Sequence, residues 1–82
     1  MQKQPVVNSK SLIRLLNNLG YEVVRQKGSH IRLKKVSEKG IHKITVPNHE
    51  EIAKGTLNDI ITKISIWNDI PKNELIIMLK EK

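Results

Sequence analysis

The spacing of apolar residues along this chain changes from that of a helix to that of a strand and back again. Between residues 9 and 20 the apolar positions are three or four residues apart, as on one face of an α-helix, and include Leu12, Leu16 and Leu19. Asn8 or Ser9 is suited to cap the start of this helix, and Gly20 to follow its end.

Three segments in the middle of the chain are typical of β-strands. The first covers residues 21–25, and a turn at residues 26–29 separates it from the second strand, which begins at His30. The third covers residues 41–46 and follows a polar hairpin loop over residues 36–40. Pro47 is expected to end the third strand, because proline cannot donate a hydrogen bond to a sheet.

Alternation along these strands predicts which side chains share a face of the sheet. Successive side chains of a strand point to opposite faces. We expect the inward face to carry the apolar residues Ile31, Leu33, Ile44 and Val46. The outward face is then expected to carry His30, Arg32, Lys34, Lys43 and Thr45.

Helical spacing returns after a polar connection over residues 48–55. Thr56 is expected to cap a second helix, whose inward face consists of Leu57, Ile60, Ile61 and Ile64. Pro71 fits the first turn of a short last helix. The order α-β-β-β-α plus a short C-terminal helix predicts an α+β fold, with a three-stranded antiparallel sheet and the helices on one face.

A length of 82 residues is that of one small domain. We expect a flexible leader over residues 1–8, the main domain over residues 9–66, and a C-terminal helical extension of the same domain over residues 67–82. No segment approaches the about 20 apolar residues of a membrane-spanning helix. The chain has no cysteine, which favours a reducing compartment, and we expect a cytoplasmic protein without membrane contact.

The chain has a formal net charge of +7, and the excess of positive charge comes from its first half. Residues 1–43 carry a net charge of +8, whereas residues 44–82 carry −1. Within residues 25–43 the only acidic residue is Glu38. This asymmetry indicates one face that binds an acidic partner, either a nucleic acid or an acidic protein.

The sequence argues against several kinds of site. Tyr21 and Trp67 are the only aromatic residues, too few to stack several bases as OB-fold binders of single strands do. The three histidines lack the close spacing to each other or to carboxylates that zinc motifs have. There is no glycine-rich loop of the P-loop type. We therefore expect no metal and no cofactor.

His30 is the strongest candidate for chemistry. It follows the turn Lys27-Gly28-Ser29 and shares its predicted strand face with Arg32 and Lys34. Histidine transfers protons near neutral pH, and clustered Lys and Arg side chains bind polyanions. The combination predicts a reaction on a nucleic acid, with His30 as its general acid or base.

The residues expected to bind RNA lie close to His30 in the sequence. Glycine without a side chain lets the backbone approach a phosphate, and the cations neutralise it. The predicted set is Arg25, Lys27, Gly28, Ser29, Arg32, Lys34 and Lys43. His42 is a candidate for a second proton-transfer group, although an ordinary polar residue at a strand end is the simpler interpretation. His49 is most simply a loop residue.

Four segments, in order and at matching spacing, resemble the HicA family, the toxin half of the HicA–HicB toxin–antitoxin systems. They are Ser9-Lys10-Ser11-Leu12 with Leu16, Gly20 to His30, Ile44 to His49, and Lys54-Gly55-Thr56-Leu57 with Ile60. The resemblance covers about residues 9–66. It implies a double-stranded-RNA-binding-domain-like fold, which has the same order of elements as predicted above.

The resemblance also implies an activity and a partner. HicA-like proteins are endoribonucleases that cleave mRNA without a metal and are inhibited by a HicB antitoxin. The histidine of the family's Gly-Ser-His motif, which is its catalytic residue, falls on His30. A toxin must be kept inactive, so we expect a HicB-like antitoxin to cover the His30 face.

Two other functions stay open from the sequence. The first is a non-catalytic binder of double-stranded RNA on the same fold, which reads shape and needs no histidine. The second is a protein-interaction module whose basic face binds an acidic partner. Cleavage that depends on His30 distinguishes the toxin ribonuclease from both alternatives.

Overall fold

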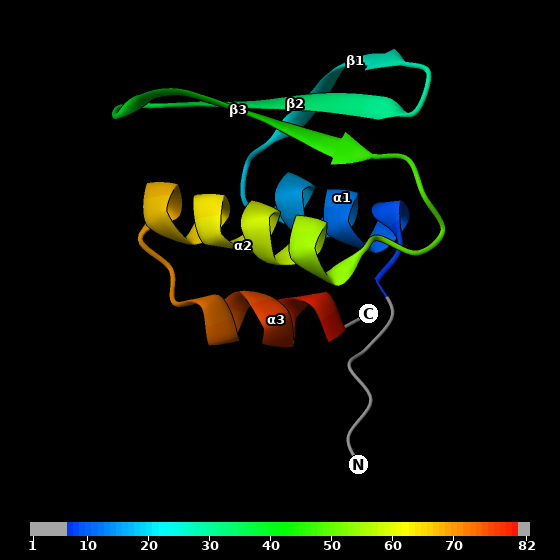
Figure 1. Cartoon of the computed structure of the whole chain (residues 1–82). Helices are drawn as coiled ribbons and strands as arrows, with labels where there is room; N and C mark the ends of the chain where they lie inside the picture. The colour runs from blue at the N-terminus through cyan, green and yellow to red at the C-terminus, as the bar shows by residue number, and fades with distance from the viewer. Residues whose placement is uncertain (1–6, 81–82) are drawn as a thin grey trace.

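The computed structural model describes residues 7–80 of the chain, and the following statements concern those residues. Three helices and three strands follow one another in the order predicted from the sequence, α-β-β-β-α-α (Figure 1). Their bounds are α1 Ser9–Asn18, β1 Glu22–Lys27, β2 His30–Ser37, β3 Gly40–Pro47, α2 Lys54–Asn68 and α3 Lys72–Lys80. None of the helices in this range has the length and apolar character that a membrane span needs.

Helix α1 begins and ends as its sequence predicts. The side chain of Asn8 accepts a hydrogen bond from the backbone N–H of Ser11 at 2.8 Å, which satisfies one free donor of the first turn. Gly20 follows the helix with a φ of +101°, a conformation that other residues rarely adopt. The buried side of the helix is formed by Ser9, Leu12, Leu15 and Leu16.

The strands form one antiparallel sheet in the order β1-β2-β3. They are longer than predicted: β2 and β3 pair as far as Ser37 opposite Gly40, so the expected loop over residues 36–40 is a two-residue turn. The polar character of this hairpin suggested a loop, but backbone pairing does not require apolar side chains. In β1, the register shifts between Val23 and Arg25, which marks a β-bulge.

The two faces of the sheet divide as the alternation predicts. Ile31, Leu33, Ile44 and Val46 are all buried on the side that faces the helices. Within residues 7–80, no helix covers the opposite face of the sheet (Figure 1). This outer sheet face is therefore open to solvent, and it carries the side chains that alternate with the buried ones.

Helix α2 begins earlier than predicted. Ala53 is its N-cap residue and makes no side-chain hydrogen bond, so the prediction that Thr56 caps the helix is wrong. The chain is held just before this point, because Ile52 is buried and its N–H donates to the carbonyl of Val7 at 2.8 Å. The helix therefore starts where the chain leaves that contact, and Thr56 lies in its first turn.

Helix α2 continues to Asn68. Asp69 then adopts a left-handed conformation with a φ of 57°, and the N–H of Ile70 donates to the carbonyl of Ser65. The predicted inward face is confirmed, since Ile60, Ile61 and Ile64 are buried and Leu57 packs against the same core.

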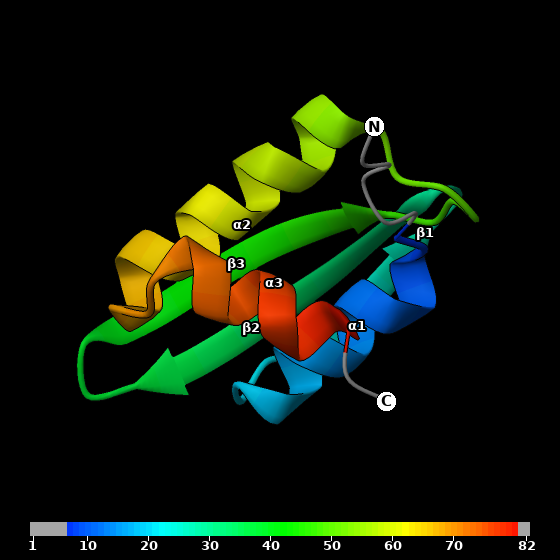
Figure 2. The same cartoon turned by 90° about the horizontal axis from the view of Figure 1, so that it is seen from below.

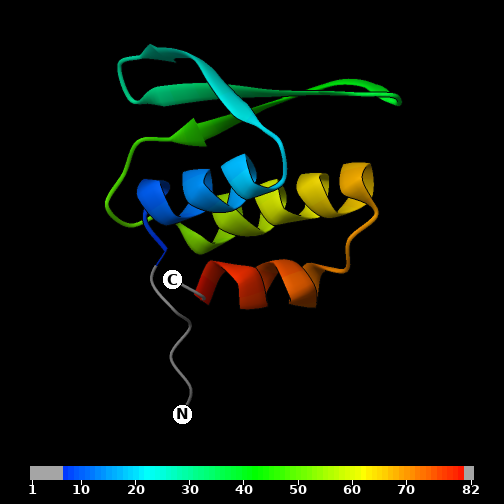
Figure 3. The same cartoon turned by 180° about the vertical axis from the view of Figure 1, so that it is seen from behind.

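Helix α3 forms a third layer. It lies on the side of α1 and α2 that faces away from the sheet (Figures 1 and 3), and Leu75 is its fully buried anchor. Seen from below, α3 lies in front of α1 and α2, with the strands behind them (Figure 2). All three helices thus lie on one side of the sheet, in the α+β, double-stranded-RNA-binding-domain-like arrangement that the sequence predicts. Most of the predicted leader, residues 1–6, lies outside the described residues, whereas Val7 is buried.

Candidate functional site

The outer sheet face brings His30 together with all of the predicted cations. His30 is the first residue of β2, and its neighbours across the sheet are Lys27 on β1 and Pro47 on β3. The next outward residue of β2 is Arg32, which lies opposite Arg25 and Thr45. Lys34 and Lys43, further along, are opposite each other. Gly28 and Ser29 form the turn at the edge of this face.

Two cross-strand pairs on this face join like charges. Arg25 is paired with Arg32, and Lys34 with Lys43. Like charges directly opposite each other in a sheet reduce stability. The one ion pair found within residues 7–80 joins Lys63 to Asp59, so none of these four cations forms an ion pair there, although Glu22 on β1 lies opposite Lys34. The sheet thus tolerates a repulsion that a bound polyanion would remove.

A hollow of about 380 Å³ surrounds His30. It is lined by Arg25, Lys27, His30, Arg32 and Thr45. The imidazole is exposed there, and no side-chain hydrogen bond of His30 is found within the described part of the chain. Its two ring nitrogens are therefore free to exchange protons with a bound molecule. Thr45 was not among the predicted site residues, although alternation along β3 had placed it on this face.

The turn before His30 is anchored to the rest of the fold. Gly28 has a φ of +57°, and a positive φ at the first central residue is favoured in two-residue hairpin turns. The carbonyl of Ser29 accepts a 2.7 Å hydrogen bond from the N–H of Asn48, just after β3. The side chain of Asn48 in turn accepts a hydrogen bond from the hydroxyl of Ser9 at 3.2 Å. His30 thus follows a turn that is connected to the start of α1.

His42 lies on the opposite side of the sheet from His30. Its position on β3 alternates with Lys43, and its ring stacks on that of Trp67 in α2, with the centroids 5.0 Å apart and the planes at 10°. The structure therefore does not bring His42 to His30, and His42 is not a second proton-transfer group for a reaction at that site. The same alternation that placed Ile44 inward indicated this position from the sequence.

A chain of hydrogen bonds connects His42 to Tyr21, Asn68 and Lys35. The amide nitrogen of Asn68 donates to the Tyr21 hydroxyl at 3.0 Å, and that hydroxyl is 2.5 Å from Nδ1 of His42. The Asn68 amide is oriented by Lys35, whose Nζ donates to its oxygen at 2.5 Å. With Tyr21 as the donor, Nδ1 of His42 accepts a hydrogen bond and the ring is neutral.

Burial and charge favour the same neutral form. Desolvation lowers the pKa of His42 below its ordinary value of 6.5, and the nearby cations Lys35, Lys39 and Lys63 lower this pKa further. Burial also raises the pKa of the Tyr21 hydroxyl, against a smaller opposing effect of its hydrogen bond with Asn68. Lys39 completes the cluster, because it lies 4.8 Å from the Trp67 ring centroid and donates to the Trp67 carbonyl.

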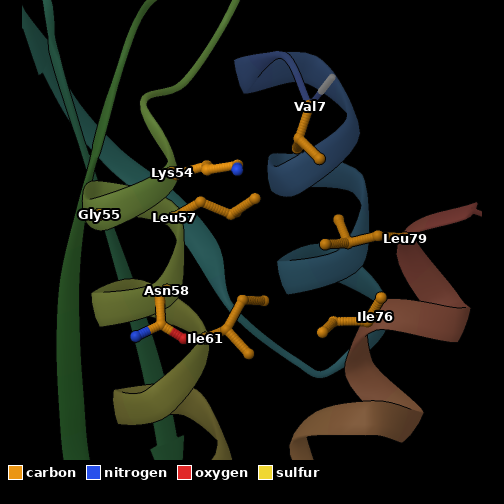
Figure 4. A pocket seen from close by; sticks show the side chains of 8 residues that line it. All are labelled: Val7, Lys54, Gly55, Leu57, Asn58, Ile61, Ile76 and Leu79. Atoms are coloured by element: carbon orange, nitrogen blue, oxygen red, sulfur yellow. The ribbon is translucent and has the colours of Figure 1, made fainter. Parts of the chain in front are cut away.

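An apolar hollow shares no lining residue with the hollow around His30. It has a volume of about 420 Å³ and opens between α2 and the elements α1 and α3 (Figure 4). Val7, Leu57, Ile61, Ile76 and Leu79 supply its apolar walls, and Lys54 is its only charged residue. Within residues 7–80, no group of three or more His, Cys, Asp or Glu side chains is placed to hold a metal ion.

Together, these features define a small α+β domain whose uncovered sheet face carries one exposed histidine among unpaired cations. The model of a protein family, described as the HicA toxin of bacterial toxin–antitoxin systems, matches residues 9–66. The chain belongs to this HicA toxin family. Comparisons with curated proteins and with solved structures return no significant match.

Proposed function

We propose that this protein is an endoribonuclease that cleaves mRNA at the outer sheet face, with His30 as its catalytic residue. The observation that carries the proposal is the placement of one exposed histidine in a hollow lined by Arg25, Lys27 and Arg32. Membership of a toxin family adds that the activity harms the cell that produces it. RNA supplies both groups that such a hollow needs: a phosphate for the cations and a 2′-hydroxyl for the histidine.

The proposed reaction requires no metal ion. The 2′-oxygen of one ribose attacks the adjacent phosphorus, and the bond from phosphorus to the 5′-oxygen breaks. The products are a 2′,3′-cyclic phosphate and a free 5′-hydroxyl. His30 takes the proton from the 2′-hydroxyl or delivers one to the leaving 5′-oxygen, and positioned proton transfer of this kind contributes about 10²- to 10⁴-fold to a rate.

The cations beside His30 have a separate role. Negative charge increases on the non-bridging phosphate oxygens as the new bond forms, and fixed cations stabilise it. Arg25 and Arg32 form a cross-strand pair in the His30 hollow, and guanidinium groups bind phosphate through two parallel hydrogen bonds. Lys27, directly opposite His30, places a further positive charge at the reacting phosphate.

We also propose that the antitoxin of this system inhibits the protein by covering the outer sheet face. The cations that bind phosphate are then the ones that meet acidic or polar groups of the antitoxin. Because His30 is exposed and lines one hollow with Arg25, Lys27 and Arg32, a partner bound there excludes RNA from the hollow.

The experiment that tests the reaction uses a defined single-stranded RNA oligomer and the purified protein in EDTA. We expect cleavage products that end in a 2′,3′-cyclic phosphate and a 5′-hydroxyl. An otherwise identical oligomer with one 2′-deoxyribose at the cleaved position should resist cleavage there, since it lacks the attacking group. A protein that binds both oligomers and cleaves neither would instead be a non-catalytic RNA binder.

A further inference from the structure

The hollow around His30 continues into a second one. The second hollow has a volume of about 520 Å³ and shares Arg25, Arg32 and Thr45 with the first. From these residues it passes Lys43 on β3 and reaches the exposed side of α2. There its walls are formed by Thr56, Asp59 and Lys63. The two hollows thus adjoin at Arg25, Arg32 and Thr45, and together their walls extend from His30 to α2.

Cations predominate among the charged residues of the two hollows, although Val24, Leu33, Ile44 and Ile60 add apolar walls to the second hollow. Arg25, Arg32, Lys43 and Lys63 line the second hollow, and Asp59 is the only acidic residue that lines it. The Asp59 carboxylate lies 3.0 Å from Nζ of Lys63, one turn along α2. Both side chains are more than half exposed, and exposed ion pairs contribute little to stability. Lys63 can therefore exchange this carboxylate for a phosphate at little cost.

We propose that a single RNA strand runs from His30 over Arg32 and Thr45, crosses β3 at Lys43, and ends against Lys63 and Thr56 on α2. The proposal rests on the function proposed above and adds a binding subsite remote from the cleaved bond. Lys63 binds a phosphate of the strand but does not touch the reacting atoms. Thr56 and Thr45 offer hydroxyl groups to the phosphates and riboses along the way.

The geometry gives Asp59 a role opposite to that of its partner. Its carboxylate repels the phosphates of a strand in the second hollow, and it competes with them for Lys63. Loss of the Asp59 charge should strengthen RNA binding, and loss of the Lys63 charge should weaken it. If the ion pair had only a structural role, loss of either charge should weaken RNA binding. The two variants therefore distinguish a structural role of the ion pair from opposite roles of Asp59 and Lys63 in binding.

The test measures the affinity of a single-stranded RNA oligomer with 2′-O-methyl riboses, which cannot be cleaved through the 2′-oxygen. The proteins are wild type, Lys63→Ala, Asp59→Asn and the matched control Lys80→Ala, an exposed lysine of α3 outside both hollows. We expect Lys63→Ala to bind about three- to tenfold more weakly. Its logarithmic salt dependence should fall by about 0.7, the contribution of one phosphate on a single strand. Asp59→Asn should bind more tightly, and Lys80→Ala should match wild type.

Two results overturn the path over α2. One is equal affinity of wild type, Lys63→Ala and Lys80→Ala. The other is weakening by both Asp59→Asn and Lys63→Ala, which would make the ion pair structural. Circular dichroism establishes that each variant is folded. If the wild-type protein binds no RNA, the proposed function itself fails, and this outcome is distinguishable from the other two.

Discussion

At the scale of single residues, the position of His30 follows from two local features. Gly28 provides the positive φ of the turn, and alternation along β2 then directs His30 and Arg32 to the outer sheet face. Both features depend on neighbours within a few positions, so the sequence alone predicts them. The anchoring of this turn by Asn48 joins segments far apart in the chain, and no local pattern indicates it.

Gly28→Ala tests the turn. A new Cβ at this position meets no atom within 4 Å, but the φ of +57° is unfavourable for alanine. We expect a loss of about 1 to 2 kcal/mol in the free energy of unfolding, measured by urea denaturation. Gly55→Ala is the matched control. It also meets no atom within 4 Å, but it lies in a helix, where alanine should increase stability by up to about 1 kcal/mol. Equal effects of the two changes would contradict this account.

His42 should make stability depend on pH. Because its pKa in the folded protein is lowered from 6.5, the unfolded chain binds more protons between that lowered pKa and 6.5. Stability therefore falls as the pH drops below about 6.5. Urea unfolding at a series of pH values from 7.5 downward should show this loss in wild type and in the control His49→Gln, and a smaller one in His42→Gln. If His42→Gln loses as much stability at low pH as wild type does, His42 is not the cause of the loss.

At the scale of elements, the sequence predicts the type and order of each helix and strand better than their limits. Spacing identified α2 through Ile60, Ile61 and Ile64, which are buried as expected. Its start was missed because the chain before it is fixed by a contact with Val7, 45 positions away from Ile52. The sequence does not predict the full length of the β2–β3 hairpin, because the residue pairs nearest its turn are exposed to solvent. Their backbone pairing does not require the alternation of polar and apolar side chains that identifies a half-buried strand.

The pairing of Lys34 with Lys43 gives a prediction for the sheet. Lys43→Thr removes a like-charge contact and places a good strand former in β3, so it should raise the free energy of unfolding by about 0.2 to 1 kcal/mol. The same change should weaken RNA binding, because a phosphate contact is lost. Lys43→Arg keeps the charge and should show neither effect. Urea denaturation measures the free energy of unfolding of the two variants, and titration with RNA measures their affinity. If Lys43→Thr binds RNA as tightly as wild type does, Lys43 does not contact a phosphate.

At the scale of the whole molecule, the three layers separate the buried core from the surface that is proposed to bind RNA. All three helices lie on one side of the sheet, and no helix in the described part of the chain covers its outer face (Figure 1). The apolar core is buried on the helical side, and cations line the hollow on the outer face. The charge asymmetry between the two halves of the chain indicated such a face. The second hollow was not predicted, because it joins β1, β2 and β3 to a helix that is distant in the sequence.

The open face also predicts where the antitoxin binds. Arg32→Glu reverses a charge in the hollow of the outer sheet face. We expect it to weaken the complex with the antitoxin strongly, because the antitoxin group that met Arg32 is left without a partner of opposite charge. Lys80→Glu, on α3, should leave the affinity unchanged. Calorimetric titration of each variant with the antitoxin compares them. Equal affinities would place the antitoxin on a different surface.

The role of His30 in RNA cleavage is tested first by a comparison of cleavage rates. Wild type, His30→Ala and His49→Ala are incubated with the same RNA in EDTA, with circular dichroism to establish folding. We expect His30→Ala to lower the rate by about 10²-fold or more, as for loss of a positioned proton-transfer group, whereas His49→Ala should cleave like wild type. Cleavage at the wild-type rate by folded His30→Ala would show that His30 is not the catalytic residue.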